Sequence, residues 1–280
     1  MEFRLKTDLY YDVYAPSTFV FSIHALKNTS NQKIISESIE ISPDLAYKEF
    51  YSQNSNIRFI TLKTNEFVPF RISYEATIEV QHKTIHKNAL LKNTPIFDLK
   101  NNIIPFLYPS RHCPSDKLIK LAFNLFGHLQ TDFEKVVAVN DWIYNNIDYV
   151  PGSTDSNTTA YNTIIQREGV CKDFAHLGIA LCRALNIPAR YFTCYAGNLY
   201  PPDIHACFEA YLGNKWILFD PTRLSSLDSI VKIAHGKDGS EIAVANIFGN
   251  AFCTYMNIEC ERLNNDSEPH TPSEDFFILY

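Results

Sequence analysis

Three residues of the chain, Cys171, His205 and Asp220, have the types and spacing of a thiol-based catalytic site. Cys171 stands in the segment REGVCKDFAHLGIALCRAL (residues 167–185), where an apolar helical run follows the cysteine directly. The N-terminal end of a helix is positively polarised, and it therefore favours the thiolate, the nucleophilic form of cysteine. The same position also suits a small buried residue, because free cysteines are among the most buried residue types.

The other two residues stand at the ends of two strand-like segments, HACFEAYLG and KWILFDPT, which share the turn GNK. His205 opens the first segment and Asp220 lies near the end of the second. If the segments pair as a hairpin across Gly213 and Asn214, the two residues lie eight and six positions from the turn, nearly side by side. A carboxylate there fixes the imidazole tautomer and stabilises the imidazolium. With Cys171 at the same edge, the three form a relay equivalent to the serine triad.

Each of these two residues also has a structural interpretation. His205 alone could be a solvent-exposed histidine at the end of a strand. Asp220 precedes Pro221, and this pairing is common at the start of a turn. Three compatible positions nevertheless favour one site over three independent coincidences.

The elements that must position these residues are predicted to be helices followed by strands. A helix is expected from a capping Ser115 to Gly127, and a second one begins at Thr131 and Glu134, which have the spacing of a capping box. The helix over residues 171–185 is apolar around most of its circumference, so we expect it to be central. Helices first and strands afterwards indicate an α+β order rather than a parallel sheet.

Residues 1–100 are predicted to form a separate all-β, sandwich-like domain. Its strand-like segments are FRLKTDLYYDVY, TFVFSIHAL, KIISESIEIS, IRFITLKT and FRISYEATIEVQ, separated by turn-prone residues. This part has no cluster of cysteine, histidine and acidic residues, which favours a structural or docking role. Residues 101–114 are expected to be a connector, and residues 115–280 the catalytic core.

Composition excludes several classes of function. The 280 residues carry a net charge of −6, which gives no basic surface for nucleic acid or for an anionic membrane. The N-terminal residues lack the pattern of a signal peptide, and no apolar run approaches the roughly 18 residues that span a bilayer, so a cytoplasmic location is expected. The seven cysteines are scattered, without a C-x-x-C pair, so neither a disulfide framework nor a structural metal is expected.

The second half resembles the transglutaminase-like superfamily of papain-related cysteine enzymes, in the bacterial form described as cysteine proteases. The segments that carry the resemblance are YPSRHCPSD, DYVPGSTDSNTTA, EGVCKDFAHLGIALCRALNIPARYFTCY, IHACFEAYLGNKWILFDPT and HGKDGSEIAVANIFGNAF. The N-terminal half resembles the β-rich domain that precedes this core in the same bacterial proteins. The resemblance implies Cys171 as nucleophile, His205 as general base and then acid, and Asp220 as the orienting carboxylate. The chain departs from the family at Cys207, where a tryptophan is usual, and at Ile204, where an aromatic residue often stands.

The chemistry implied is attack of the Cys171 thiolate on a peptide or carboxamide carbonyl, giving a thioester acyl-enzyme. The backbone N–H of Cys171 is one expected donor to the oxyanion. Tyr149 is the candidate for the second donor, although it could simply be a packing aromatic, and Asn157 and Thr158 stand behind it. Asp173 is interpreted as an acid that complements the helix dipole. The remaining histidines and cysteines of this half are interpreted as structural or solvent residues: His112, Cys113, His176, Cys182, Cys194 and His235.

The expected function is therefore that of a cysteine peptidase or amidase, acting on a protein or peptide without a cofactor. Two alternatives remain at this point. A lysine amine instead of water could resolve the acyl-enzyme, which would make the protein a crosslinking transamidase. The fold could also be a non-catalytic scaffold whose β-domain binds a partner.

Overall fold

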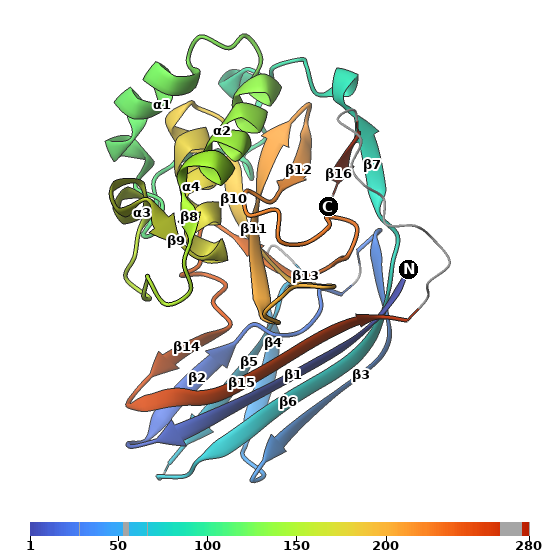
Figure 1. Cartoon of the computed structure of the whole chain (residues 1–280). Coiled ribbons are helices and arrows are strands. Elements are labelled where there is room, and N and C mark those ends of the chain that lie inside the picture. The colour runs from blue at the N-terminus through green and yellow to red at the C-terminus, as the bar shows by residue number, and fades with distance from the viewer. Residues whose placement is uncertain (28, 53–55, 66, 264–275, 280) are drawn as a thin grey trace.

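The computed structural model describes residues 1–27, 29–52, 56–65, 67–263 and 276–279. The chain forms a β-sandwich and a mixed α+β half that lies against one end of it (Figure 1). Within the described residues, no helix has the length and apolar character needed to cross a membrane.

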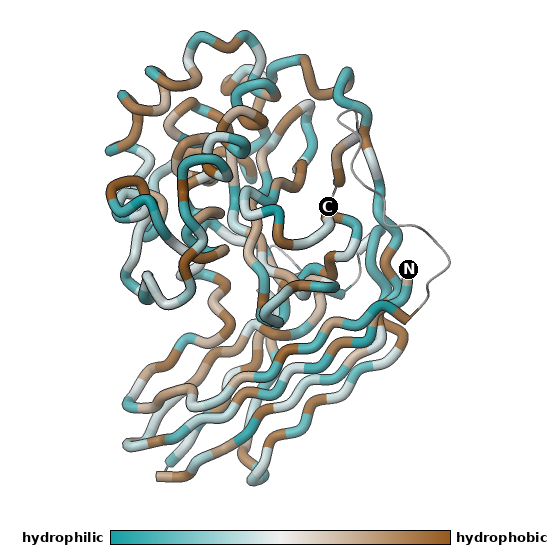
Figure 2. Tube along the Cα trace, viewed as in Figure 1, coloured by the Kyte–Doolittle hydropathy of each residue, from teal (hydrophilic) through white to brown (hydrophobic). Residues whose placement is uncertain are grey.

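The sandwich consists of two antiparallel four-stranded sheets. The first has the order β15 (Ala251–Arg262), β1 (Glu2–Val13), β6 (Phe70–Val80), β3 (Gln32–Ser42), and the second the order β14 (Ala245–Phe248), β2 (Ser17–Phe21), β5 (Arg58–Thr64), β4 (Tyr47–Tyr51). Apolar and polar residues alternate along these strands (Figure 2), as expected when one face of each sheet is buried. The inward side chains include an aromatic cluster in which Phe19 and Phe70 meet edge to face with ring centroids 4.9 Å apart.

The α+β half contains a six-stranded sheet in which the neighbouring strands are antiparallel. Its order is β13 (Ile230–Gly236), β10 (Ala189–Ala196), β11 (Ile204–Leu212), β12 (Lys215–Phe219), β16 (Phe276–Leu279), β7 (Lys83–His86). β11 and β12 form the predicted hairpin, and both turn residues, Gly213 and Asn214, have positive φ angles (54° and 64°). Such angles suit the tight turns whose twist matches that of the paired strands.

Four helices and a short parallel strand pair pack beside this sheet. They are α1 (Ile119–Phe126), α2 (Asp132–Asn146), α3 (Ala160–Gln166), α4 (Cys171–Ala184), β8 (Asp148–Tyr149) and β9 (Glu168–Gly169), preceded by the 3₁₀ turns η1 (Lys87–Ala89), η2 (Ile96–Asp98), η3 (Ile104–Leu107) and η4 (Ser115–Lys117). The predicted capping box of Thr131 and Glu134 is confirmed. The predicted start at Ser115 differs, because Ser115 opens a 3₁₀ turn and α1 begins at Ile119.

Helix α4 is central, as predicted, and nearly all of its residues are buried. It approaches β11 closely at Gly178, where an added Cβ would lie 2.7 Å from the ring of Phe208. A side chain at this position would push the helix away from the sheet. Gly178 therefore helps to set the distance between the helix that carries Cys171 and the strand that carries His205.

The predicted domain boundaries differ from the structure at both ends. β14 and β15, assigned to the core over residues 115–280, pair with β2 and β1 and complete the sandwich. β7, assigned to the N-terminal domain, pairs with β16 in the sheet of the α+β half. Both differences arise from pairing between segments that are far apart in the sequence, which the alternation of a single strand does not reveal.

Candidate active site

Cys171 is the first residue of α4, and its surroundings are built around the end of that helix. The carboxylate of Asp173 accepts hydrogen bonds from the backbone N–H of Val170 (3.0 Å) and from the Thr154 hydroxyl (2.6 Å), and it pairs with the ammonium of Lys172 (2.8 Å). The Asp173 charge is thus neutralised locally while it caps its own helix. The helix start is held firmly, with Cys171 9% exposed at the boundary between core and solvent.

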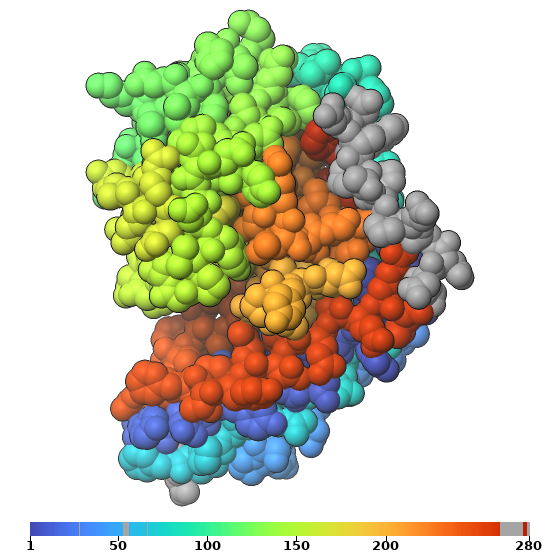
Figure 3. All heavy atoms as spheres, viewed as in Figure 1, coloured from blue at the N-terminus to red at the C-terminus, as the bar shows by residue number. Residues whose placement is uncertain are grey.

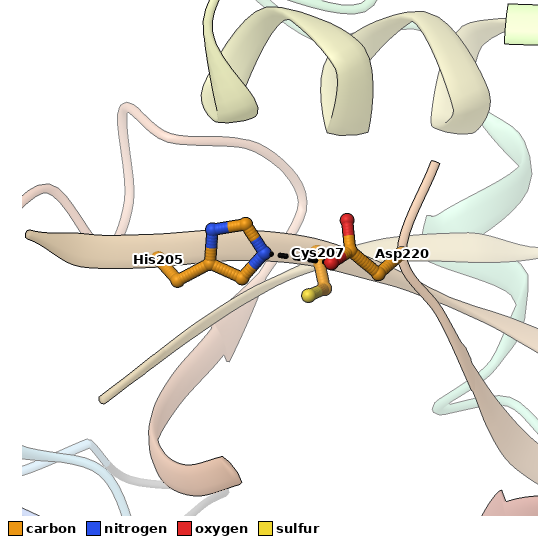
Figure 4. Close-up of side chains that lie close together, drawn as sticks. All are labelled: His205, Cys207 and Asp220. Atoms are coloured by element: carbon orange, nitrogen blue, oxygen red, sulfur yellow. Dashed lines mark hydrogen bonds and ion pairs between the residues drawn. The ribbon is translucent and has the colours of Figure 1, made fainter. Parts of the chain in front are cut away.

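His205 and Asp220 lie together as the hairpin predicts. The Nε2 atom of His205 is 2.9 Å from Oδ2 of Asp220, and the second carboxylate oxygen accepts hydrogen bonds from the backbone N–H and the hydroxyl of Thr222 (Figure 4). Burial by itself would lower the pKa of His205. The neighbouring Cys207 and Asp220 outweigh it and raise the His205 pKa well above its ordinary value. The imidazolium is therefore the stable form of this ring near neutral pH.

The opposite side of the imidazole faces Cys171. The Cys171 thiol hydrogen-bonds to the ring and contributes to the raised pKa of His205. Nε2 is engaged by Asp220, and Nδ1 is buried without a nitrogen or oxygen partner in the described part of the chain. The structure thus brings the three predicted residues into one chain of contacts, thiol to imidazole to carboxylate.

Tyr149 lies beside Cys171 because of the short β8–β9 pair. Tyr149 is paired with Gly169, two residues before Cys171, and the Val150 N–H donates to the Gly169 carbonyl (2.9 Å). Desolvation, followed by the nearby Cys171 sulfur, raises the pKa of Tyr149 to about 12, and its hydroxyl contacts both the backbone and the thiol of Cys171. The Tyr149 hydroxyl is therefore neutral and can donate a hydrogen bond next to the sulfur.

The other two candidates for the second donor are placed differently. Thr158 lines the same cleft as Cys171, but its hydroxyl is engaged with Asp155 (3.2 Å). Asn157 is not among the described residues that line the cleft, and its backbone N–H donates to Asp155 (2.8 Å).

A cleft of about 800 Å³ opens at Cys171 and His205. One side is formed by the loop over residues 154–158 and by the start of α4, and another by residues 239–247, which lead into β14. The cleft thus lies between the helical part and the sandwich, where the space-filling view is hollowed (Figure 3). This volume is in the range of pockets that enclose a ligand of several residues or a small organic molecule.

Sequence reasoning missed several residues that line this cleft. His112 and His176, interpreted as structural or solvent residues, both line it, and their rings stack with centroids 5.0 Å apart. Asp203 lies at its mouth, where burial raises the pKa of its carboxyl group above the usual value. The segment over residues 239–247 carried a signal, since it falls within the family-like stretch HGKDGSEIAVANIFGNAF, but that stretch has no residue type that indicates a role.

Cys207 lies next to the His205–Asp220 pair, and the three side chains place their ligand-type atoms within 4.8 Å of one another (Figure 4). Histidine, cysteine and aspartate could together hold a transition metal. Here both Asp220 oxygens and the Nε2 of His205 are already engaged in hydrogen bonds within the protein. Burial also raises the pKa of the Cys207 thiol well above its ordinary value, which disfavours the thiolate that a metal requires. The arrangement suits a hydrogen-bonded catalytic pair better than a metal centre.

Two family matches cover most of the chain. Residues 1–102 match the N-terminal domain of bacterial transglutaminase, and residues 119–221 match the transglutaminase-like superfamily. The uncharacterized protein ML0607 of Mycobacterium leprae (strain TN) is 26% identical over 165 residues, which cover 55% of this chain and 59% of that protein. The uncharacterized protein Rv2569c of Mycobacterium tuberculosis (strain ATCC 25618 / H37Rv) is 30% identical over 115 residues, covering 36% and 37%. The matches therefore span less than two thirds of these curated relatives.

A solved structure matches the whole fold. It is that of a putative cysteine protease from Cytophaga hutchinsonii, which is 49% identical, covers 100% of this chain and 98% of its own, and superposes with a TM-score of 0.95. Together with the two family matches, this similarity identifies the chain as a member of the transglutaminase-like superfamily with a bacterial-transglutaminase N-terminal domain.

Proposed function

We propose that this protein is a thiol-dependent hydrolase that cleaves peptide or carboxamide bonds through Cys171, His205 and Asp220. The observation that carries the proposal is the placement of the His205 ring. One nitrogen is 2.9 Å from Asp220, while the ring also contacts a cysteine thiol at a helix N-terminus and at the edge of a cleft. A buried imidazole held between a carboxylate and a thiol is the arrangement that generates a nucleophilic sulfur.

The first half of the reaction forms an acyl-enzyme. The Cys171 sulfur attacks the carbonyl carbon, and the carbonyl electrons move to oxygen as the tetrahedral intermediate forms. The His205 imidazolium then donates its proton to the leaving nitrogen as the C–N bond breaks, which leaves a thioester on Cys171. The Asp220 carboxylate keeps the ring in the required orientation and stabilises its charged form.

The oxyanion needs donors close to Cys171. The backbone N–H of Cys171 is in the first turn of α4 and therefore has no partner within the helix. In the resting protein the Tyr149 hydroxyl contacts this N–H, so both groups must turn to the oxyanion as it develops. Tyr149 is thus proposed as the second donor.

In the second half, water replaces the amine. Neutral His205 removes a proton from a water molecule in the cleft, the resulting hydroxide attacks the thioester carbonyl, and the sulfur leaves as thiolate. The released carboxylic acid and the regenerated thiolate–imidazolium pair complete the cycle. The similarity to a protein from Cytophaga hutchinsonii described as a putative cysteine protease supports hydrolysis.

The test is the pH dependence of Cys171 alkylation by iodoacetamide, followed by mass spectrometry of the Cys171 peptide. We expect rapid labelling near pH 6 in the wild type and labelling at least about tenfold slower in His205→Ala, because the imidazolium stabilises the thiolate. The exposed Cys253 is an internal control in the same digest, since partial burial raises the pKa of its thiol and it should label slowly at pH 6.

Slow labelling of Cys171 at pH 6 in both proteins would overturn the proposed function and favour a scaffold. If Cys171 is reactive, product analysis with an unfolded protein such as casein gives the fate of the acyl group. New amino termini support hydrolysis. Incorporation of an added primary amine without new termini would replace hydrolysis with transamidation.

A further inference from the structure

The cleft that contains Cys171 is bounded by an edge strand of the sandwich. β14 pairs with β2 on one side, and no strand within the described residues pairs with its other side. Three of its four residues, Ala245, Asn246 and Ile247, line the same cleft as Cys171 and His205. The unpaired edge is therefore continuous with the candidate active site.

The register of β14 determines which backbone groups face that open edge. The Ser22 N–H donates to the Val244 carbonyl (3.1 Å), and these residues are opposite each other in the ladder, so they form a hydrogen-bonded pair. In an antiparallel ladder such pairs alternate with non-hydrogen-bonded ones. The N–H and C=O groups of Ala245 and Ile247 therefore point away from β2, toward the open edge. Each of these residues offers one donor and one acceptor there.

The segment that leads to β14 is fixed to both halves of the protein. The Nε2 atom of His176, on α4, accepts the Gly239 N–H (3.0 Å), and Asp238 accepts the N–H groups of His112 (2.8 Å) and Ser240 (2.9 Å). With the Val244 bond to β2, these contacts tie the segment to the helix of Cys171 at one end and to the sandwich at the other. Such a preorganised edge costs little conformational entropy when it binds a partner.

We propose that the substrate is an extended polypeptide that adds to the open edge of β14 as a further strand, with peptide groups bonded to Ala245 and Ile247. The scissile carbonyl then lies at Cys171. This inference rests on the proposed function and specifies its substrate class. Strand addition draws its affinity from main-chain hydrogen bonds, so it requires a segment with a free, extended backbone. An unfolded chain or a terminal segment meets that requirement, whereas a small amide does not.

The experiment compares two irreversible probes of Cys171 in the full-length protein. Each carries an acyloxymethyl ketone, from which the thiolate displaces a carboxylate to form a thioether. One probe is capped with an acetyl group and the other with a tetrapeptide that has an equimolar mixture of amino acids at every position. In the wild type we expect the tetrapeptide probe to react at least about tenfold faster, since one backbone hydrogen bond corresponds to roughly a factor of ten.

Ala245→Pro removes the N–H that faces the edge and leaves the ladder to β2 intact. Proline is tolerated at edge positions where the N–H is not used in the sheet. The preference for the tetrapeptide probe is expected to fall about tenfold in this variant. Ala245→Ser keeps the N–H at a similar volume and is the matched control, which should retain the preference.

Tetrapeptide probes methylated at one backbone nitrogen at a time give the same test on the wild-type protein, without any change to its fold. Loss of preference at one or two alternate positions supports strand addition. Equal rates for the tetrapeptide and acetyl probes in the wild type, or an unchanged preference in Ala245→Pro, would overturn the proposal. Failure of the proposed function has a different signature, because Cys171 would then be slow with both probes and with iodoacetamide.

Discussion

Two buried charged clusters lie on the same face of β11, and they are built differently. One is the His205–Asp220 pair, and the other is Glu209 with Arg190 and Lys232. Glu209 bonds the Nε of Arg190 and lies 3.2 Å from the ammonium of Lys232. Burial opposes the ionised form of Glu209, but these two cations hold its pKa below the usual value. All three side chains are nearly inaccessible, so this cluster is closed to solvent.

The cations of the closed cluster are also covered by aromatic rings. The Arg190 guanidinium lies 4.1 Å from the centroid of the Trp216 ring, and the Lys232 ammonium lies 4.5 Å from that of Phe192. In the catalytic pair, by contrast, one side of the His205 ring contacts the Cys171 thiol at the cleft. Burial of charge alone therefore does not mark a functional site. What separates the two clusters is whether the charged group has an outlet to a reactive atom and to solvent.

The largest expected effect that tests this comparison comes from two isosteric substitutions. Asp220→Asn should lower turnover by about 10²- to 10⁴-fold with little change in the free energy of unfolding, because it alters the imidazole tautomer but not the packing. Glu209→Gln should lower the free energy of unfolding by about 3–5 kcal/mol, because two buried cations lose their counter-charge. Denaturant unfolding and steady-state kinetics on the same preparations measure both quantities.

The folded fraction of Glu209→Gln should keep its turnover within a few-fold of the wild type. If Glu209→Gln instead abolished turnover without loss of stability, the two clusters would have to be regarded as one functional network.

The next prediction is that the two clusters respond to pH with opposite signs. Burial lowers the pKa of Lys232 from 10.5 to about 8. Between these pH values the folded protein binds fewer protons at Lys232 than the unfolded chain, so this group makes stability rise with pH, by up to about 3 kcal/mol. The pKa of His205 is raised, so its stabilising contribution is complete below about pH 6.5 and is lost as the pH rises through the raised value.

The measurement is the free energy of unfolding of the wild type between pH 6 and 10.5, minus that of Lys232→Met and, separately, minus that of His205→Gln. The first difference should increase with pH and the second should decrease. Two differences that change in the same direction would show that the assignment of one of the two groups is wrong.

The smallest expected effect concerns the oxyanion. Tyr149→Phe removes only the hydroxyl, and we expect kcat to fall about tenfold. This is less than the 10²- to 10³-fold loss typical of a dedicated donor, because the hydroxyl must first turn from Cys171. Alkylation of Cys171 by iodoacetamide forms no oxyanion and should keep its rate. An equal loss in both assays would indicate that Tyr149 positions the thiol instead.

Sequence reasoning was most successful where the contacts are local. The proximity of His205 and Asp220 follows from their distances to one two-residue turn, and the structure places them at hydrogen-bond distance. The position of Tyr149 depends on a two-residue parallel pair, β8 with β9, which has no periodicity to detect. The placement of β14 and β15 in the sandwich depends on partners more than 200 residues away, and alternation within a strand says nothing about which strand it will join.

The return of β14 and β15 to the sandwich has a consequence for the order of folding during synthesis. Thr7 of β1 pairs with Ile258 of β15, about 250 residues later, so the α+β half emerges from the ribosome before the sandwich can be completed. Contacts of such separation carry a large loop-closure entropy and form late. β1 and β2 can pair early with β6 and β5, which leaves their other edges to await the last strands. The edge proposed to receive the substrate is therefore among the last parts of the molecule to be put in place, and a nascent chain would carry the catalytic cysteine before it could hold a polypeptide against it.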